Sequence, residues 1–213
     1  RILDLGKSQD VGDMTRDEFK STILFDYRLI SEVRESGAQG RRDVLSGKGS
    51  FGIFGDGKEL AQVAMAKVFR DGDFRAGYYR DQALMTAIGQ YSPKHMFSAL
   101  YGDPELEREP SSGSRQMMNH FSTRFLNDDG SWRNLMEQKN STADMACLAS
   151  QFPRLVGLAQ ASQVYRENKE LAVKNPEPFI VKLLAVEVII LPSILVTTGI
   201  TVATLTKEVR VAS

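Results

Sequence analysis

Residues 77–82 combine the side chains that proteins use to bind anions. Two adjacent tyrosines and the guanidinium of Arg80 come just before a helix that the sequence predicts to begin near Asp81. Free backbone N–H groups and the dipole at a helix start favour negative charge, so a phosphate group is the natural ligand. The residues alone leave a second interpretation open, in which Arg80 pairs with Asp81 or Asp73 on the surface and the tyrosines pack in the core.

His120 is the second candidate for chemistry. It lies in the polar, turn-rich segment 102–146, and a loop of this length in a compact domain is usually functional or disordered. There a histidine could act as a general acid or base, or donate a hydrogen bond to developing negative charge, although an exposed histidine without a role is equally open. Cys147 has no basic neighbour and is interpreted as an inert buried thiol, and His95, beside Lys94, as a surface residue.

The composition excludes several classes of function. The chain has 213 residues, of which 42% are hydrophobic and 25% charged, and 27 basic side chains balance 27 acidic ones. Zero net charge argues against nucleic acid or an anionic membrane as the partner. One cysteine cannot form an internal disulfide, and one cysteine with two histidines cannot build a structural zinc site. We therefore expect a reducing, cytoplasmic setting, and no secretory signal is recognised at the first residue.

Hydrophobic periodicity and breaker residues predict the elements that position these side chains. Thr15 and Glu18 form a capping box for a helix over 15–36, which a glycine-rich connection over 37–57 would follow. Further helices are expected at 58–69, from 81, at 93–101, and at 152–168, the last one largely buried.

The tail changes character, because β-branched residues dominate positions 179–211 in short runs typical of buried strands. Parallel strands need long crossovers, yet only two or three residues separate these runs. The uncharged stretch 188–206 has the length of a membrane helix, but its β-branching, Pro192 and Gly199 favour strands. The runs could form tight antiparallel ribbons without good hairpin turns, but we expect discontinuous segments, with intervening sequence missing.

Four motifs in order resemble one family: FGIFGDGKELAQVAMAK at 51–67, GDFRAGYYRDQ at 72–82, RQMMNH at 115–120 and QFPR at 151–154. They are similar to the α half of the thiamine-diphosphate-dependent decarboxylating component of 2-oxo acid dehydrogenase complexes, and the branched-chain enzymes resemble them most. The resemblance implies an α/β class with the thiamine-diphosphate-binding fold, in which helices flank a central, mostly parallel sheet. It also implies three parts: an N-terminal helix and connection at 1–50, the cofactor-binding domain at 51–171, and a strand-rich tail at 172–213 drawn from a β half.

The resemblance also assigns roles to individual residues. It implies that Tyr79 and Arg80 bind the cofactor diphosphate and that His120 stabilises charge on the substrate or intermediate. The family segment Pro-Leu-Ala-Thr-Gln is similar to residues 147–151. By that match the main chain of Leu148 would meet the aminopyrimidine ring of the cofactor.

The same match would place potassium on Ser150 and Gln151. Cysteine for proline and serine for threonine are departures within that segment, although serine keeps the hydroxyl ligand. The family also uses Mg²⁺, but its Gly-Asp motif is not found after Leu171. Gly55-Asp56-Gly57 is not followed by asparagine at the spacing that a magnesium motif requires.

The activity implied is oxidative decarboxylation of a 2-oxo acid, a branched-chain acid above others, followed by transfer of the acyl group to a lipoyl carrier. The implied partners are the β half, as a subunit or fused behind the α half, and the lipoyl domain of the dihydrolipoyl acyltransferase, with neither nucleic acid nor membrane. Two alternatives remain: a pyruvate-specific member of the family, and a non-catalytic or membrane-anchored protein on the same scaffold.

Overall fold

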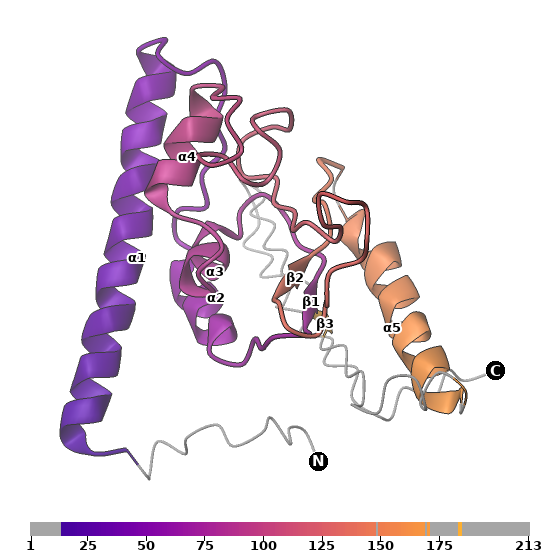
Figure 1. The fold of residues 1–213 in the computed structure, drawn as a ribbon. Helices are drawn as coiled ribbons and strands as arrows, with labels where there is room; N and C mark the ends of the chain where they lie inside the picture. The colour runs from indigo at the N-terminus through magenta and orange to yellow at the C-terminus, as the bar shows by residue number, and fades with distance from the viewer. Residues whose placement is uncertain (1–13, 148, 169, 171–182, 185–213) are drawn as a thin grey trace. The chain divides into compact units, whose positions relative to one another are not determined.

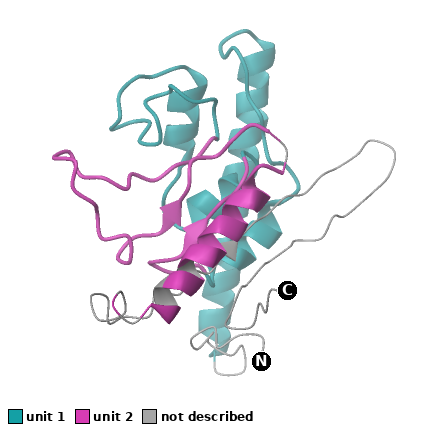
Figure 2. Ribbon diagram, turned by 90° about the vertical axis from the view of Figure 1, so that its right-hand side faces the viewer, with its two compact units in different colours: residues 1–68, 79–119 teal, residues 69–78, 120–213 magenta. Residues whose placement is uncertain are grey.

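The computed structural model describes residues 14–147, 149–168, 170 and 183–184 (Figure 1). The chain divides into two compact units, residues 1–68 with 79–119, and residues 69–78 with 120–213 (Figure 2).

Helix α1 (Arg16–Leu45) begins as its sequence predicts. The Thr15 hydroxyl accepts a hydrogen bond from the Glu18 backbone N–H at 3.3 Å, and a Glu18 carboxylate oxygen accepts one from the Thr15 N–H at 2.9 Å. These reciprocal bonds satisfy two of the N–H groups that a helix start leaves open. The capping box is confirmed.

The end of α1 differs from the expectation, because the helix continues through Gly37 and Gly40 to Leu45. The glycines serve close packing there. A Cβ atom on Gly40 would lie 2.7 Å from Cζ of Phe54, and one on Gly37 would lie 2.9 Å from Oδ1 of Asp56. The prediction of an irregular connection from residue 37 was therefore wrong for its first nine residues. Glycine is required at these two positions by a tertiary contact, and this requirement outweighs the low helix propensity of glycine.

Three short helices complete the first unit: α2 (Glu59–Ala66), α3 (Gln82–Ala87) and α4 (Pro93–Leu100). All three were predicted, and the Ser92 hydroxyl caps α4 by accepting from the His95 N–H at 3.4 Å. Leu29, Val63 and Ala83 join α1, α2 and α3 in a buried apolar cluster. Leu60, in the first turn of α2, is 73% exposed.

The second unit contains a small parallel sheet and one helix. Its strands are β1 (Phe74–Arg75), β2 (Asn140–Ser141) and β3 (Leu183–Leu184), in the order β2-β1-β3. Phe74 pairs with Asn140 on one side and with Leu183 on the other, both in parallel register. The described part thus agrees with a parallel α/β class, although it is mostly helical, and the larger central sheet stays a prediction.

Helix α5 (Gln151–Glu167) follows β2 in the chain. Leu155 packs with Phe74 and Ala76 in the apolar cluster of this unit. The prediction that this helix is largely buried was wrong, since Val156 is 66% exposed and Phe152 also lies at the surface. Among the described side chains of α5, Leu155, Leu158 and Ala159 contact the apolar cluster of this unit.

Within the described ranges, no helix is both long and apolar enough to cross a bilayer. The uncharged stretch 188–206 lies outside the described residues, as does nearly all of the predicted tail. The boundaries proposed at residues 50 and 171 stay predictions.

Candidate functional site

Arg80 and Tyr79 lie side by side in the first unit. The Arg80 guanidinium carbon stands 4.8 Å from the centroid of the Tyr79 ring, and both residues are half-buried. Stacking on an aromatic face holds a guanidinium in place while leaving its N–H groups available. Among the described residues the Arg80 side chain has no ion pair and no hydrogen bond, so the interpretation in which Arg80 is neutralised on the surface by Asp81 or Asp73 is not supported.

The start of α3 is organised differently from the sequence hypothesis. The Gln62 side-chain oxygen accepts hydrogen bonds from the backbone N–H groups of Ala83 at 3.0 Å and Leu84 at 3.2 Å. These two N–H groups were expected to be available to an anion. Because Gln62 already occupies them, anion binding at this place depends on the Arg80 guanidinium and its neighbours.

Two glutamines and a glycine fix the backbone of Arg80, and we call Gly55, Gln62 and Gln82 the amide frame. Gln62 donates from Nε2 to the Arg80 carbonyl oxygen at 2.8 Å, and Gly55 donates its N–H to Oε1 of Gln82 at 2.7 Å. A Cβ atom on Gly55 would lie only 2.6 Å from the Arg80 carbonyl oxygen. These roles were not predicted from the sequence, although all three residues belong to the motifs at 51–67 and 72–82.

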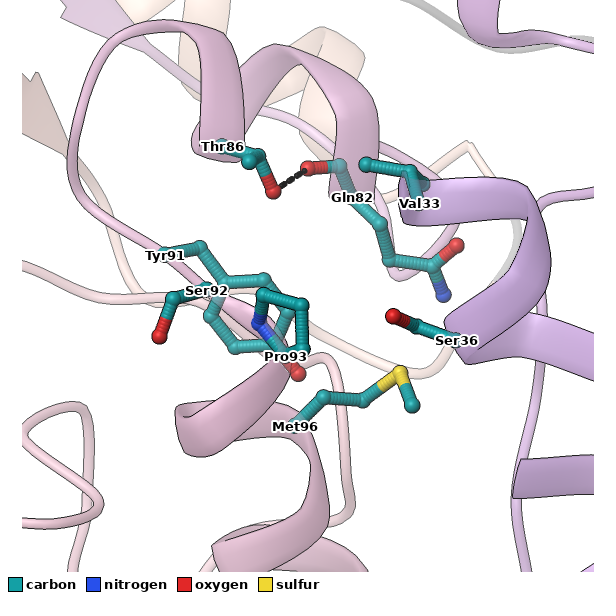
Figure 3. Close-up of a pocket in the computed structure, with 8 residues that line it drawn as sticks. All are labelled: Val33, Ser36, Gln82, Thr86, Tyr91, Ser92, Pro93 and Met96. Atoms are coloured by element: carbon teal, nitrogen blue, oxygen red, sulfur yellow. Dashed lines mark hydrogen bonds between the residues drawn. The ribbon is translucent and has the colours of Figure 1, made fainter. Parts of the chain in front are cut away.

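Gln82 also lines a small pocket between α1, α3 and α4, with Val33, Ser36, Tyr91 and Met96 around it (Figure 3). The Thr86 hydroxyl donates to the backbone carbonyl of Gln82 at 2.8 Å on one wall of the pocket. No lining residue carries a charge. The pocket therefore has no side-chain charge to balance an anion.

His120 belongs to the second unit and is 7% exposed, so it is not the exposed loop residue that the sequence left open. The next residue, Phe121, donates its backbone N–H to Oδ2 of Asp144 at 3.1 Å. Asn119, just before His120, has a left-handed φ of 64°. The histidine therefore lies on a sharply bent and anchored segment, which is a common setting for functional side chains.

Asp144 owes its position to Arg75. The guanidinium donates to both carboxylate oxygens, at 3.1 Å and 3.0 Å, and both side chains are almost fully buried. Arg75 also donates to the Tyr78 carbonyl at 3.0 Å and lies 5.3 Å from the ring centroid of Phe121. Gly77 leaves the space that this guanidinium occupies. The pairing of Arg75 with Asp144 was not predicted from the sequence, because no local pattern links residues 69 positions apart.

The segment 147–151 is described in part. Leu148 lies outside the described residues. Ala149 has a left-handed φ of 63°, Ser150 is the N-cap residue of α5, and Gln151 is 2% exposed. Cys147 is exposed, so the prediction of a buried thiol was wrong.

His95 also differs from its expectation. It is half-buried, and burial lowers its pKa, although the carboxylate of Glu109 acts in the opposite direction. No group of three or more histidine, cysteine, aspartate or glutamate side chains within the described residues could hold a metal ion.

The site residues predicted from sequence are therefore distributed over both units. Tyr79 and Arg80 are together in the first, while His120, Ser150 and Gln151 belong to the second. Each group is anchored within its own unit by hydrogen bonds that the sequence did not reveal.

Comparison with known proteins gives one family. The family described as dehydrogenase E1 component matches residues 39–174, which is nearly two thirds of the chain and includes every residue of the amide frame, Tyr79, Arg80 and His120. A search among curated proteins found no significant match. The chain belongs to the dehydrogenase E1 component family, as an α-type component of the thiamine-diphosphate-dependent 2-oxo acid dehydrogenases.

Proposed function

We propose that this chain is the α half of an enzyme that decarboxylates a branched-chain 2-oxo acid and passes the acyl group reductively to a lipoyl carrier. Membership of the family supports 2-oxo acid dehydrogenase activity in general. The observation that carries the proposal is the Arg80 guanidinium, which is half-buried, stacked on Tyr79 and without an ion pair among the described residues. Such a cation is stabilised when an anionic ligand binds to it.

The donor set around Arg80 suits the diphosphate of thiamine diphosphate. A planar guanidinium binds two phosphate oxygens at once, and the amide frame fixes the backbone from which it projects. Tyr79 and Arg80 would hold the diphosphate, and the main chain of Leu148 would meet the aminopyrimidine ring. When bound, the cofactor supplies the carbon nucleophile and the electron sink that decarboxylation of a 2-oxo acid requires.

His120 is assigned to the substrate side. Its segment is bent at Asn119 and anchored by the bond from Phe121 to Asp144, so the backbone that carries the imidazole is held in place. A buried imidazole can donate a hydrogen bond to the carboxylate or carbonyl oxygen of a 2-oxo acid. In that role His120 would orient the substrate and stabilise negative charge on its oxygen.

Metal ions complete the proposal. Mg²⁺ would accompany the diphosphate, and its protein ligands are not assigned within the described ranges. Potassium would use the hydroxyl of Ser150 and the side-chain oxygen of Gln151, because hard cations prefer oxygen ligands. Both side chains follow a strained residue, Ala149, at the start of α5.

The proposed partners are the β half of the same enzyme and the lipoyl domain of the acyltransferase, in a cytoplasmic setting. E1 components of this family work with a β subunit and a lipoyl acyltransferase in a complex. A pyruvate-specific enzyme is the alternative within the family. Steady-state rates with pyruvate and with 3-methyl-2-oxobutanoate, using a lipoyl acceptor, discriminate between the two.

Calorimetric titration of thiamine diphosphate, with Mg²⁺ present, tests the central assignment. Arg80→Ala should weaken binding by about 100-fold or more, because the main diphosphate donor is lost. The control Arg28→Ala removes an exposed charge from α1 and should leave the affinity unchanged. Equal affinities for Arg80→Ala and the unmodified protein would refute the assignment of Arg80.

A further inference from the structure

A second cation, Lys58, lies in the turn that packs against Arg80. The Lys58 N–H donates to the Gly55 carbonyl at 3.3 Å and closes this turn before α2. Gly55 itself touches the Arg80 carbonyl so closely that no side chain fits between them. The turn and Arg80 are thus held in direct contact by the amide frame.

The acidic neighbours of Lys58 are committed to other partners. Glu59 receives two hydrogen bonds from Arg34, at 2.7 Å and 2.8 Å. Asp56 pairs with Arg41, which also lies on α1. Both carboxylates are therefore paired with arginines of α1, and within the described ranges neither forms an ion pair with Lys58.

Within the described ranges, neither the Lys58 ammonium nor the Arg80 guanidinium has an ion pair or a side-chain hydrogen bond. Lys58 is half-buried. Burial, followed by repulsion from Arg80, lowers the pKa of Lys58, and the attraction of Glu59 and Asp56 only partly opposes this. Two neighbouring cations of this kind repel each other until an anion neutralises both.

We propose that Lys58 and Arg80 form a two-cation subsite that binds the diphosphate group of the cofactor, with Lys58 as its second charged contact. The inference rests on the proposed function. A diphosphate carries more than one negative charge, so it matches two cations better than the single carboxylate of a 2-oxo acid does. The guanidinium supplies planar, two-pronged donors, and the ammonium supplies a point charge.

The test is calorimetric titration of the full chain, assembled with its β half, by thiamine diphosphate and by thiamine monophosphate, each with Mg²⁺. Lys58→Met should raise the Kd for thiamine diphosphate about 10- to 30-fold, and that for the monophosphate by a smaller factor. The affinity of the variant should also fall less steeply with added salt, because one screened charge is gone. Lys20→Met, which removes an exposed charge from α1, should match the unmodified protein.

Two further measurements separate charge from folding. Without cofactor, Lys58→Met should melt no earlier than the unmodified protein, because the substitution removes a repulsion, and the cofactor should raise its Tm less. Lys58→Arg, which keeps the charge, should bind within about 3-fold of the unmodified protein. If Lys58→Met fails to fold, Lys58→Gln takes its place.

The outcomes are distinguishable. Equal affinities of the unmodified protein and Lys58→Met would overturn the subsite and leave the proposed function intact. The same loss in Lys58→Arg as in Lys58→Met would also overturn it, because the effect would then not follow the charge. If the unmodified protein binds no thiamine diphosphate, the proposed function fails, and the subsite fails with it.

Discussion

Two arginines that stand five positions apart, Arg75 and Arg80, have opposite surroundings. Arg75 is 1% exposed and bound to both oxygens of Asp144, while Arg80 is half-buried and has no anion among the described residues. A buried charge without a partner is costly, so Arg75 requires Asp144 for the fold itself. The charge of Arg80 remains available, so it can serve a ligand. The difference shows that the environment of an arginine, more than its motif, separates a structural cation from a binding one.

Removal of Arg75 tests whether its pairing with Asp144 is required for the fold. Arg75→Met should lower the free energy of unfolding by about 3–5 kcal/mol, because Asp144 is left buried without its counter-charge. Urea denaturation measures the change. The double variant Arg75→Met with Asp144→Leu should recover most of the loss, since both charges are then absent. A single variant as stable as the unmodified protein would show that the pair is not needed for the fold.

Gly55 tests whether the amide frame really positions Arg80. Gly55→Ala should destabilise the protein by about 1–3 kcal/mol, because the new methyl group would overlap the Arg80 carbonyl and force the backbone apart. It should also weaken cofactor binding, as measured by calorimetry. The control is Gly157→Ala in α5, because a Cβ atom there meets open space and the variant should keep its stability. Gly89 is unsuitable as a control, since its positive φ would strain an alanine. If Gly55→Ala binds the cofactor as tightly as the unmodified protein, the amide frame does not position Arg80 for binding.

Glu109 is a second buried carboxylate, and backbone N–H groups bind it where Asp144 is bound by an arginine. Ser112 and Ser114 donate their N–H groups to it at 2.8 Å and 2.9 Å. Burial raises the pKa of Glu109, but these bonds outweigh burial and hold the pKa below its ordinary value. The resulting stability is complete above the unfolded-state pKa of about 4.3 and is lost as the pH falls through the lower folded-state pKa.

Glu109→Gln should therefore cost about 1–2 kcal/mol at pH 7 and less at pH 3. Urea midpoints measured across this range follow the change. Glu107→Gln, an exposed position nearby, provides the control. A cost that stays constant from pH 7 to pH 3 would contradict the assignment of this stability to the ionised carboxylate.

The smallest expected effect concerns Tyr79. Tyr79→Leu removes the aromatic face under Arg80 and should raise the Kd for thiamine diphosphate about 2- to 5-fold. Tyr79→Phe keeps that face and should retain the cation–π contribution. If the leucine variant binds as tightly as the phenylalanine variant, stacking contributes nothing to the orientation of Arg80.

Local signals in the sequence predicted part of this molecule well. The capping box at Thr15 fixed the start of α1, and the motif at 77–82 placed Tyr79 and Arg80 before α3. Local patterns could not show that Gly40 packs against Phe54, so the helix was ended too early. The helix continues through Gly40 because of a contact that exists only in the folded chain.

The same limit applies to the site. The polar loop singled out His120 and the family resemblance gave it a role, yet the groups that anchor its segment, Arg75 and Asp144, were not predicted because their pairing spans 69 positions. Gln62 was equally hidden, since glutamine in an amphipathic helix looks like an ordinary solvent-facing residue. Its burial and its bonds to Arg80, Ala83 and Leu84 appear only in three dimensions.

Gln62, Gln82 and the Gly55 peptide are neutral and do not titrate, so neither proton concentration nor ionic strength loosens their hydrogen bonds around Arg80. The hydrogen bonds that position Arg80 therefore do not depend on the charge state of Arg80 or Lys58. If the affinity for the cofactor changes with pH or salt, the change therefore reflects the charges of the ligand, Lys58 and Arg80, and not a rearrangement of the amide frame.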